Sequence, residues 1–477
     1  MPTTLDSPLV SSPTRLVEHR GIDLIPEVDR RATPRSLGWM WAGGLCNVEY
    51  VVYGAIVLSF GLSLPQAIAV ILVGNLTYVL AGLASLPGPA AGTSTFALSR
   101  AAFAPTGAQG LSVFNWLTMV AYETEGLALV ALAVLALLAQ AGVHRTTVLV
   151  VVVVAVAAAV QGLLPLIGYA AILRAFRLLV VPFTALFLIM AVIALPKVHA
   201  VHHSGSWVDL SMAFAFAASA SGLGWTIQAS DYSRYLPTRT PARRVIGTVS
   251  IAGFIPSAVL MCLGAVVATT ISSATDPISG LAKVFPAWFL VPYLVVVIAQ
   301  LLTINTLDLY SSGLTVQAAG IRISRMRAVA IDLVVSAALT LVAVLSNSFN
   351  TLINDLITLL IVWTVPWTAV FLVDWVLRRG RYDGKQLVGP GVRSAWASRP
   401  GVRGGVRTVA AVAMLAGMAA AAVCVDTPVF TGPVSRTLHG ADLSIPAGLL
   451  VAGGIYWVLA RRKVRAESKG VAVGPLS

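Results

Sequence analysis

Residues 219–228, SASGLGWTIQ, place two glycines and a tryptophan within a long apolar segment, and residues 41–47, WAGGLCN, place two glycines within another. Glycine is about 1 kcal/mol less favourable than alanine inside a helix, so each stretch is a candidate interruption. Pairs of small residues also allow two membrane helices to pack closely. The two stretches occupy matched positions five apolar segments apart, and this match favours interruption over packing alone.

The composition requires lipid as the solvent for much of the surface. Of the 477 residues, 57% are hydrophobic and 11% are charged, and the mean hydropathy is +0.87. Soluble proteins carry roughly 25% charged residues, so the charges present here do not suffice to cover a globule of this size. The sequence therefore predicts an all-α polytopic membrane protein in a lipid bilayer.

Twelve apolar segments are long enough to span a bilayer, which takes about 20 residues of helix. We expect transmembrane helices over residues 38–60, 64–86, 108–139, 147–169, 172–195, 209–236, 245–270, 288–318, 327–346, 350–378, 406–425 and 443–461. Residues 1–37 are too polar for a cleavable signal peptide. They are expected to form a cytoplasmic tail, as are residues 462–477, and residues 379–405 are expected to form a cytoplasmic loop.

The basic residues orient these spans. With the N-terminus in the cytoplasm, all but four of the 32 Lys and Arg residues fall on the cytoplasmic side. The four exceptions are Arg145, Lys197, Lys283 and Arg436. This alternation follows the positive-inside rule and predicts a multi-pass protein of the cell (plasma or inner) membrane with both termini cytoplasmic. It also explains the net charge of +13 without nucleic acid as a partner.

The two glycine-rich stretches fall in the first and sixth spans, which run in opposite directions. A five-plus-five inverted repeat demands this arrangement, and transporters built in this way bind substrate where two discontinuous helices meet near the bilayer midplane. We therefore expect a ten-helix core over 38–378, with repeats 38–195 and 209–378. Two further helices follow over 406–461.

Several short motifs resemble the nucleobase–cation symporter family, the purine–cytosine permease and hydantoin and allantoin transporter group. The resemblance runs from GIDLIPEVDR, residues 21–30, through the tenth helix, and so covers most of the chain. The order and spacing of the motifs carry it. They are Trp41 followed by Gly54-Ala55, GLSLPQA (61–67), LSRAAF (98–103), QASDYSRYLP (228–237), NTLDLYSSGL (305–314) and VDW (373–375).

The resemblance implies a LeuT-like fold, with ten helices in the inverted repeat, two C-terminal helices, and helices 1 and 6 broken. It also implies that a flat substrate is held between an aromatic residue of the third helix and a tryptophan of the sixth. These positions correspond to Tyr122 and to Gly224-Trp225. The family's polar residue one turn after the aromatic falls at Gly126, a departure that bears on substrate identity.

The resemblance further implies where a coupling sodium ion would bind. Sodium-coupled members hold the ion between the first-helix break and the eighth helix. Thr303 keeps a hydroxyl, whereas Leu302 stands where a second hydroxyl is expected, so the coupling cation is either sodium or a proton. The positions that this implies for ion coupling are Gly43, Gly44, Cys46, Leu302 and Thr303.

Carboxyl groups deep in the spans are the strongest functional signal from the residues themselves, because a charge at mid-bilayer costs about 2.5–3.5 kcal/mol or more. Glu123 and Glu125 lie about 200° apart around a helix, so they cannot face one cavity. Glu125 shares a face with Tyr122. We expect Glu125 to bind ring N–H groups or a cationic substrate, and Glu123 to form interhelix hydrogen bonds.

Glu49 and Asp308 are two further carboxyl groups within the predicted spans. Burial favours the protonated form of a carboxyl group, so either could accept a coupling proton. Each could equally serve as a structural hydrogen-bonding group. The neighbouring amides Asn47, Gln228 and Asn305 complete the set of candidate substrate-binding residues.

Two other acidic residues are predicted to form ion pairs at helix ends. Asp374 precedes Arg378 by four residues, a spacing that places the two side chains on one helix face. Asp332 follows Arg327 closely and is expected to pair in a similar way.

Histidines and cysteines give little support for a metal or a disulfide. His199, His202 and His203 cluster in one loop, but no Cys or carboxylate set accompanies them. The three cysteines lie far apart within apolar stretches, without CxxC spacing. We expect neither a metal nor another cofactor.

These observations predict a secondary transporter that imports a nucleobase or related planar nitrogen heterocycle by cation symport with alternating access. The class includes cytosine, purines, uracil, hydantoin and allantoin. The extra carboxyl groups leave open a cationic vitamin such as thiamine or a pyridoxine-like ring. A membrane-embedded enzyme or a channel is less favoured, since neither a catalytic motif nor repeated charge rings are found. The sequence does not indicate the oligomeric state.

Overall fold

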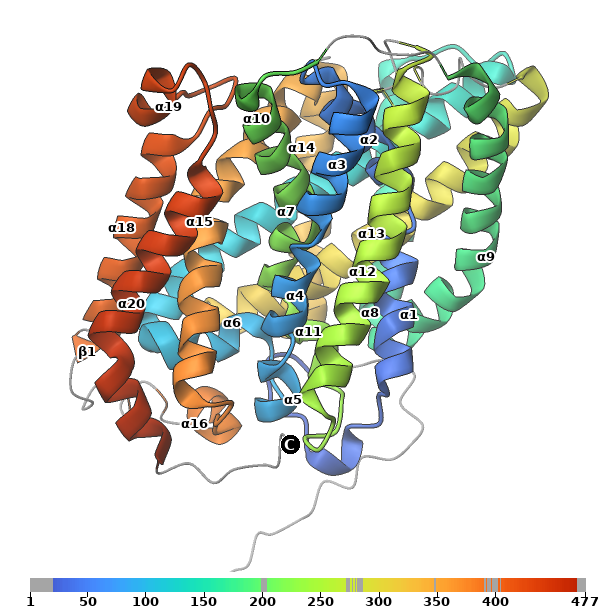
Figure 1. Ribbon diagram of the computed structural model, residues 1–477. Coiled ribbons are helices and arrows are strands. Elements are labelled where there is room, and N and C mark those ends of the chain that lie inside the picture. The colour runs from blue at the N-terminus through green and yellow to red at the C-terminus, as the bar shows by residue number, and fades with distance from the viewer. Residues whose placement is uncertain are drawn as a thin grey trace, which may run out of the picture.

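A computed structural model of the chain consists almost entirely of helices (Figure 1). It describes residues 20–198, 204–271, 275, 276, 278, 280, 286–346, 349–389, 392, 396, 402, 403 and 405–469, with side chains left out for 349–359. The all-α polytopic fold class is confirmed. The one sheet within the described residues is a two-residue ladder between β1 (Val402–Arg403) and β2 (Val406–Arg407).

The long helices correspond one to one to the predicted spans. In chain order they are α1 (Pro34–Leu45) with α2 (Val48–Ser59), α3 (Leu64–Asn75) with α4 (Tyr78–Ala84) and α5 (Pro87–Ala91), α7 (Arg100–Gln140), α8 (Thr147–Ile167), α9 (Tyr169–Ala194), α10 (Trp207–Ala218) with α11 (Ala229–Ser233), α12 (Ala242–Ala268), α13 (Ala287–Ala318), α14 (Arg325–Leu345), α15 (Phe349–Arg378), α18 (Thr408–Cys424) and α20 (Ser444–Lys469).

Length and composition qualify ten of these helices within the described residues as membrane spans, and the bent pair of α1 and α2 as an eleventh. With 17 residues, α18 is a shorter apolar helix. The count of twelve crossings and the repeat boundaries 38–195 and 209–378 stay predictions. The short helix η1 (Glu27–Asp29) precedes the first span, and α6 (Thr95–Leu98), η2 (Leu195–Lys197), α16 (Gly384–Val388) and α19 (Pro433–Thr437) lie between spans.

Several predicted boundaries differ from the observed ones, most of all in the last helix, where α20 continues to Lys469 instead of ending at 461 and so takes in part of the predicted tail 462–477, and in the third. The third helix begins at Arg100 rather than at 108, because a kink at Ala104, just before Pro105, joins a short segment to the main helix. Proline removes one backbone donor and clashes with the preceding turn, which explains a bend there. The division between the fourth and fifth helices falls at Gly168, whose φ of 118° suits glycine.

The first span is divided just after its glycines. A capping box between Thr33 and Ser36 starts α1, and Asn47 caps α2 by accepting a hydrogen bond from the backbone N–H of Glu49 (2.7 Å). The two helices meet at a bend of 59°. Gly43 and Gly44 lie inside α1, where a Cβ would come within 2.5 Å of Phe176 and 2.8 Å of Leu307, respectively. These glycines therefore serve close packing, while the interruption follows at Cys46 and Asn47.

The sixth span is irregular in its middle. After α10 the chain forms a wide π-helical turn over Ser219–Leu223 and a tight 3₁₀ turn over Gly224–Gln228 before α11. Ser221, inside the wide turn, has non-helical dihedral angles (φ −120°, ψ −135°), and Gln228 also departs from helical values (φ −127°, ψ 4°). A Cβ on Gly222 would lie 2.0 Å from the backbone nitrogen of Tyr78, so α4 packs directly against this irregular turn.

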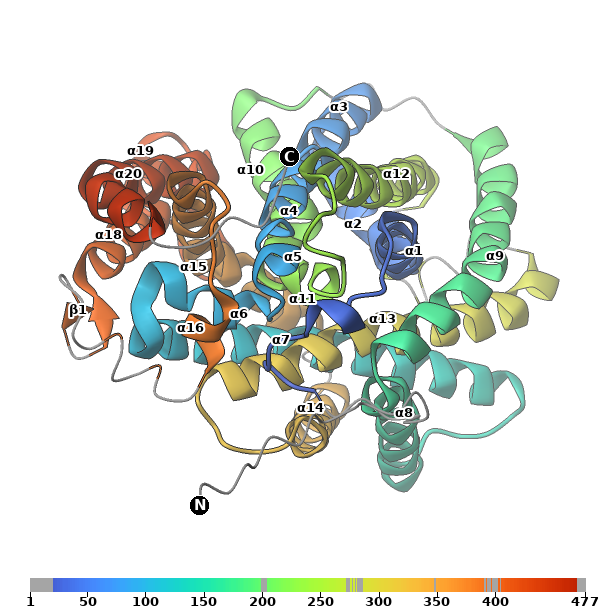
Figure 2. The ribbon, with the colours of Figure 1, turned by 90° about the horizontal axis from the view of Figure 1, so that it is seen from below.

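Figures 1 and 2 show how the helices are arranged. α7 and α13 cross obliquely through the middle of the bundle, whereas α18 and α20 lie at one edge beside α15, and α9 lies at the opposite edge.

Two glycines allow α2 and α12 to cross at backbone contact. A Cβ on Gly54 would lie 1.8 Å from the carbonyl oxygen of Met261. A Cβ on Gly264 would lie 1.8 Å from the carbonyl oxygen of Val51.

This crossing predicts a steric effect on stability. Gly264→Ala should destabilise the protein by about 1–3 kcal/mol, because overpacking forces two backbones apart. Gly247→Ala, on the same helix with open space at its Cβ position, is the matched control and should be neutral or slightly stabilising. Thermal unfolding of the two purified variants in detergent measures the difference. Equal melting temperatures would contradict the close crossing.

Candidate substrate site

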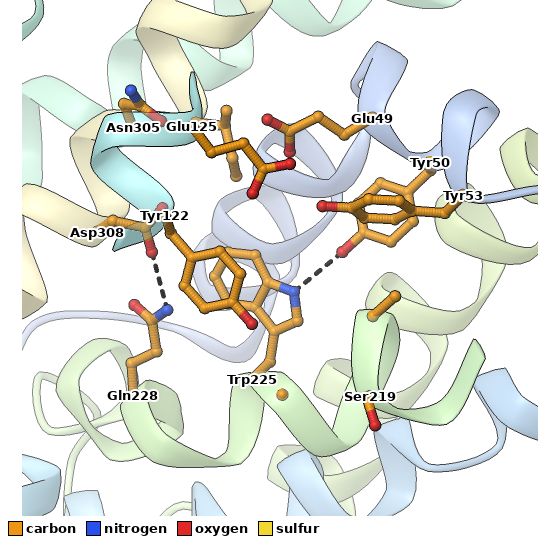
Figure 3. A pocket seen from close by; sticks show the side chains of 13 residues that line it. Glu49, Tyr50, Tyr53, Tyr122, Glu125, Ser219, Trp225, Gln228, Asn305 and Asp308 are labelled. Atoms are coloured by element: carbon orange, nitrogen blue, oxygen red, sulfur yellow. Dashed lines mark hydrogen bonds between the residues drawn. The ribbon is translucent and has the colours of Figure 1, made fainter. Parts of the chain in front are cut away.

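A cavity lies where the divided first span, the irregular sixth span, α7 and α13 meet. Figure 3 shows the side chains that surround it. The lining residues are Glu49, Tyr50, Tyr53, Tyr122, Glu125, Ser219, Ala220, Gly224, Trp225, Gln228, Ile304, Asn305 and Asp308.

Trp225 is held in a fixed orientation at one wall of the cavity. Its indole nitrogen donates a hydrogen bond to the Tyr50 hydroxyl (2.9 Å). That hydroxyl lies 3.1 Å from the hydroxyl of Tyr78, which in turn lies 2.8 Å from that of Ser257 on α12. The ring of Tyr53 packs edge-on against that of Tyr50. The polar edge of the indole is thereby satisfied by protein groups, so its apolar face can serve a ligand.

Gly224 is required by the turn that precedes it, and it lies in contact range of the other predicted aromatic residue. A Cβ at this position would lie 2.3 Å from the carbonyl oxygen of Ser219 and 3.9 Å from the hydroxyl of Tyr122. Any larger residue would therefore collide with the preceding turn. The structure brings Tyr122, Gly224 and Trp225 to one cavity, as the sequence predicted, although these residues come from α7 and the sixth span.

Three carboxyl groups line the same cavity. Figure 3 shows those of Glu49 and Glu125 pointing toward one another, while Asp308 lies across the cavity beside Gln228. Gln228 donates from its amide nitrogen to Asp308 (3.0 Å) and accepts from the Tyr232 hydroxyl, which fixes the orientation of the amide. The lining contains no Lys, Arg or His, so these acids have no cationic side chain within the cavity wall.

Asn305 and Gly126 meet in a way that the sequence alone did not indicate. Gly126 is not among the lining residues; a Cβ there would lie 2.1 Å from the side-chain oxygen of Asn305. The Asn305 amide nitrogen donates to the backbone oxygen of Glu123 (3.2 Å) and to the side-chain oxygen of Gln161 (3.1 Å). The missing side chain at 126 thus leaves room for an amide supplied by α13.

Asn47 does not line the cavity either. Its side chain caps α2 and donates to the carbonyl oxygen of Gly44 (3.3 Å). It therefore positions the backbone at Glu49 and stabilises the interruption, instead of reaching the space where a ligand would lie.

The residues proposed for ion coupling do not converge on a single site. The α1 helix touches α13 through Gly44 and Leu307. The Cys46 sulfur, however, lies 3.9 Å from the Thr184 hydroxyl of α9, and the Thr303 hydroxyl donates to Ala299 of its own helix. Leu302 is partly buried and apolar.

Five lining residues were missed from the sequence. Tyr53 follows Glu49 by four residues, and that spacing places both on one face of α2, so helical periodicity could have identified it. Ser219 and Ala220 lie in the irregular turn itself. Tyr50 and Ile304 gave no signal, because their positions depend on how distant helices pack.

The remaining predictions fall away from the cavity. Asp374 and Arg378 form the expected pair, with 2.7 Å between oxygen and nitrogen. The expected pair of Asp332 with Arg327 is wrong, since Asp332 accepts hydrogen bonds from Trp116 and Ser312 instead.

Histidines 199, 202 and 203 lie outside the described residues. Within the described part of the chain, no group of three His, Cys, Asp or Glu side chains could hold a metal ion.

Comparison with known proteins places these features in context. The family model described as "Permease for cytosine/purines, uracil, thiamine, allantoin" matches residues 24–448. The chain is 26% identical over 475 residues to YxlA of Bacillus subtilis (strain 168), which carries the name of a purine-cytosine permease; the match covers 94% of this chain and 97% of the relative.

Solved structures share the fold at low sequence identity. Mhp1, a nucleobase-cation-symport-1 family transporter in a closed conformation with bromovinylhydantoin bound, gives a TM-score of 0.71 at 16% identity, over 95% of this chain and 96% of that chain. The inward-facing conformation of Mhp1 gives 0.67 at 16% identity, over the same shares. A manganese transporter of Eremococcus coleocola gives 0.51 at 11% identity, over 96% and 98%.

The hydrogen bond of Trp225 predicts a stability difference between two tyrosines of the cavity wall. Tyr50→Phe leaves the indole N–H without its acceptor, which costs about 1–3 kcal/mol when the group is buried. Tyr53→Phe is the control, because its ring packs similarly against Tyr50 and Phe216. Thermal unfolding should show a lower melting temperature for Tyr50→Phe only. A larger loss in Tyr53→Phe would contradict this role of Tyr50.

Proposed function

The chain belongs to the nucleobase–cation symporter family, and on that premise we propose that it imports a small planar nitrogen heterocycle of the nucleobase, hydantoin or allantoin class by symport with a cation. The observation that supports this most directly is the cavity at the two interrupted spans, which both Trp225 and Tyr122 line. The family and the fold are those of transporters, and we propose no catalytic activity.

The walls and the edge of the cavity would contribute differently to recognition. Stacking of a flat ring on aromatic side chains is worth about 1–3 kcal/mol per ring and tolerates any planar heterocycle. Polar groups at the ring edge select among heterocycles. Gln228, oriented by Asp308 and Tyr232, offers both an amide and a neighbouring carboxyl group. Glu125 would accept ring N–H groups from the opposite side.

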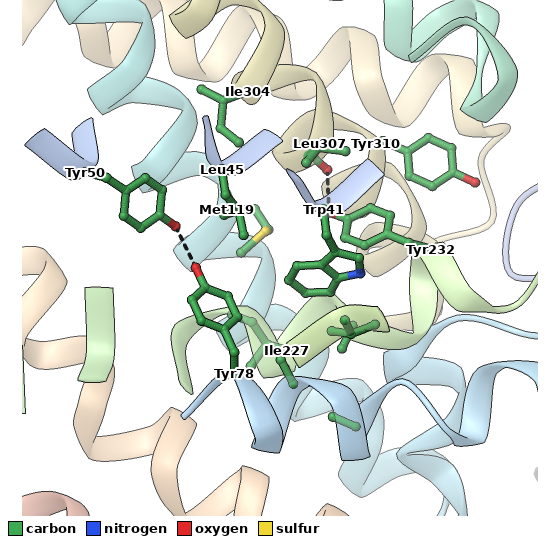
Figure 4. Close-up of a cluster of buried hydrophobic side chains, with 14 of the residues drawn as sticks. Trp41, Leu45, Tyr50, Tyr78, Met119, Ile227, Tyr232, Ile304, Leu307 and Tyr310 are labelled. Atoms are coloured by element: carbon green, nitrogen blue, oxygen red, sulfur yellow. Dashed lines mark hydrogen bonds between the residues drawn. The ribbon is translucent and has the colours of Figure 1, made fainter. Parts of the chain in front are cut away.

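An aromatic layer next to the cavity would act as its barrier on one side. Figure 4 shows Trp41 surrounded by other buried side chains. Its ring makes edge contacts with those of Tyr78, Trp225 and Tyr232, with centroids 6.3, 5.8 and 5.9 Å apart. Because Trp41 lies on α1 and Trp225 on the sixth span, a shift of either segment would open this layer and expose the substrate. Alternating access requires such a shift.

A cationic heterocycle, such as thiamine or a pyridoxine-like ring, is a second candidate substrate. The three carboxyl groups of Glu49, Glu125 and Asp308 favour it, since the cavity lining holds no basic side chain to balance them. A protonated or quaternary ring would supply that charge.

The proposal includes a location and an orientation. Many apolar helices and the permease family indicate a multi-pass membrane protein. We propose that it lies in the cell (plasma or inner) membrane with both termini cytoplasmic, because this orientation puts most basic residues inside.

Uptake of labelled heterocycles into proteoliposomes tests the proposal. Cytosine, a purine, uracil, hydantoin and allantoin are offered with inward sodium and proton gradients, and saturable uptake abolished by ionophores is expected for at least one. Trp225→Ala should lower affinity about tenfold or more, from the stacking energy lost. Trp288→Ala, at an exposed end of α13, is the control. Full activity of Trp225→Ala would contradict the site.

Replacement of one carboxyl group distinguishes the two substrate classes. Glu125→Gln keeps the shape of the side chain and removes its charge. For a cationic ring, binding measured by thermal shift should weaken strongly, because an opposite charge in a cavity of low dielectric is lost. For a neutral nucleobase, a smaller loss is expected, since the glutamine oxygen can still accept a hydrogen bond. Tight thiamine binding that is insensitive to Glu125→Gln would exclude Glu125 as the charge partner, and absence of thiamine binding would exclude thiamine as the cationic substrate.

A further inference from the structure

A second buried acidic group lies behind the cavity, on the opposite face of α7. Glu123 and Asp332 are both fully buried, and they belong to helices α7 and α14, which both pack against α13. Neither residue lines the cavity. Burying a carboxyl group within a membrane helix costs free energy, so two such groups outside the site call for an explanation.

Glu123 and Asp332 both lie along the line where α7, α13 and α14 contact one another, which we call the seam. The register between α7 and α13 shows how this line runs. Asn305 of α13 donates to the backbone oxygen of Glu123 (3.2 Å), and Asn115 of α7 donates to Thr315 (3.0 Å). The helices therefore run antiparallel and in contact over this whole stretch. Trp116 and Glu123 are seven residues apart and so share a face of α7, and the Trp116 indole nitrogen donates to Asp332.

The α13 side of the seam is a polar stripe that reaches the cavity. Asn305, Asp308 and Ser312 are spaced at i, i+3 and i+7, which places them on one face. The first two line the cavity, and the third donates its hydroxyl proton to Asp332 (2.8 Å). Side chains of a helix lean toward its N-terminus. The carboxyl group of Glu123 is thereby directed along the seam toward Ser312.

Glu123 lacks the donors that an ionised carboxylate needs. Neither of its oxygens has a hydrogen-bond partner within the described residues. Ser312 lies close by, but its single proton is donated to Asp332. Burying a carboxylate without donors is costly, whereas a protonated carboxyl can donate to the free lone pair of the serine oxygen. The site thus suits Glu123 in its protonated form.

The charged groups on the packed helices add no compensating cation beside Glu123. Asp308 faces it from α13 and Asp332 from α14. On α14, Arg327 is exposed, and Arg325, two turns before Asp332, donates to the carbonyl oxygens of Pro165 and Leu166.

We propose that the coupling cation is a proton, and that Glu123, Ser312 and Asp332 form the part of its path that lies behind the cavity. This inference rests on the proposed symport function. The Glu123 carboxyl gives its proton to the Ser312 oxygen while the serine gives its own proton to Asp332. Glu123 ends ionised, Asp332 ends protonated, and the serine is restored. Asp332 lies two turns from the start of α14 and releases the proton toward that end, which the proposed orientation makes cytoplasmic.

Sodium-free proteoliposomes with a pH gradient of one unit test this path. That gradient supports at most about tenfold accumulation of a neutral substrate carried with one proton. Glu123→Gln and Ser312→Ala should lower accumulation to about onefold. Substrate exchange without a gradient should stay within about twofold of the unmodified protein, because the cavity is intact. Ser336→Ala, a buried serine of α14 whose hydroxyl bonds to Leu333 of its own helix, is the matched control and should accumulate normally.

Wild-type accumulation in both variants would overturn the inference, as would wild-type transport driven by a sodium gradient and unaffected by pH. A substrate-independent measurement keeps these outcomes apart from a failure of the proposed function. Infrared spectroscopy of the purified protein between about pH 5 and pH 9 should show a protonated carboxyl band that Glu123→Gln removes. If the unmodified protein exchanges none of the heterocycles, the proposed function is refuted, while the proton site still stands on the infrared band. Absence of the Glu123 band would refute the proton site alone.

Discussion

Backbone groups cannot remain unpaired in a lipid environment, and the whole site depends on how the two irregular spans meet that constraint. In the first span, Asn47 supplies a side-chain cap at the start of α2 and returns a hydrogen bond to Gly44. In the sixth, a wide helical turn contains the non-helical residue Ser221, whose hydroxyl donates to the carbonyl oxygen of Ala217 (2.6 Å), and a tight turn follows it. Both solutions keep polar backbone away from lipid and leave a cavity between the spans.

The two glutamates of α7, Glu123 and Glu125, have different surroundings because they lie on opposite faces of the helix. One face carries Tyr122 and Glu125 into the cavity, where a ligand can reach them. The other carries Trp116 and Glu123 against α13 and α14. A single helix therefore joins the place where a heterocycle would bind to a polar seam within the bundle. On the proposal made above, this one helix would link substrate recognition to proton movement.

Composition and the lengths of the apolar segments predicted the fold class, and the family resemblance implied Tyr122, Gly224 and Trp225 as site residues. Helical periodicity assigned residues to faces of the third helix, since it depends only on spacing along one chain segment. The separation of Glu123 from Glu125, and the shared face of Tyr122 and Glu125, were visible in this way. The partner of Asp332 was not, because Trp116 lies more than two hundred residues away. Likewise, the role of Asn47 as a helix cap depends on where the helix restarts, which composition alone does not determine.

The contact between Gly126 and Asn305 has an evolutionary consequence. Since a Cβ at 126 would occupy the place of the Asn305 amide, a polar side chain can enter this space from α7 or from α13, but not from both. Replacing either residue alone would leave a clash or an empty pocket. The two positions should therefore change together among related chains, and a switch of ligand preference at this point would pass through a paired substitution.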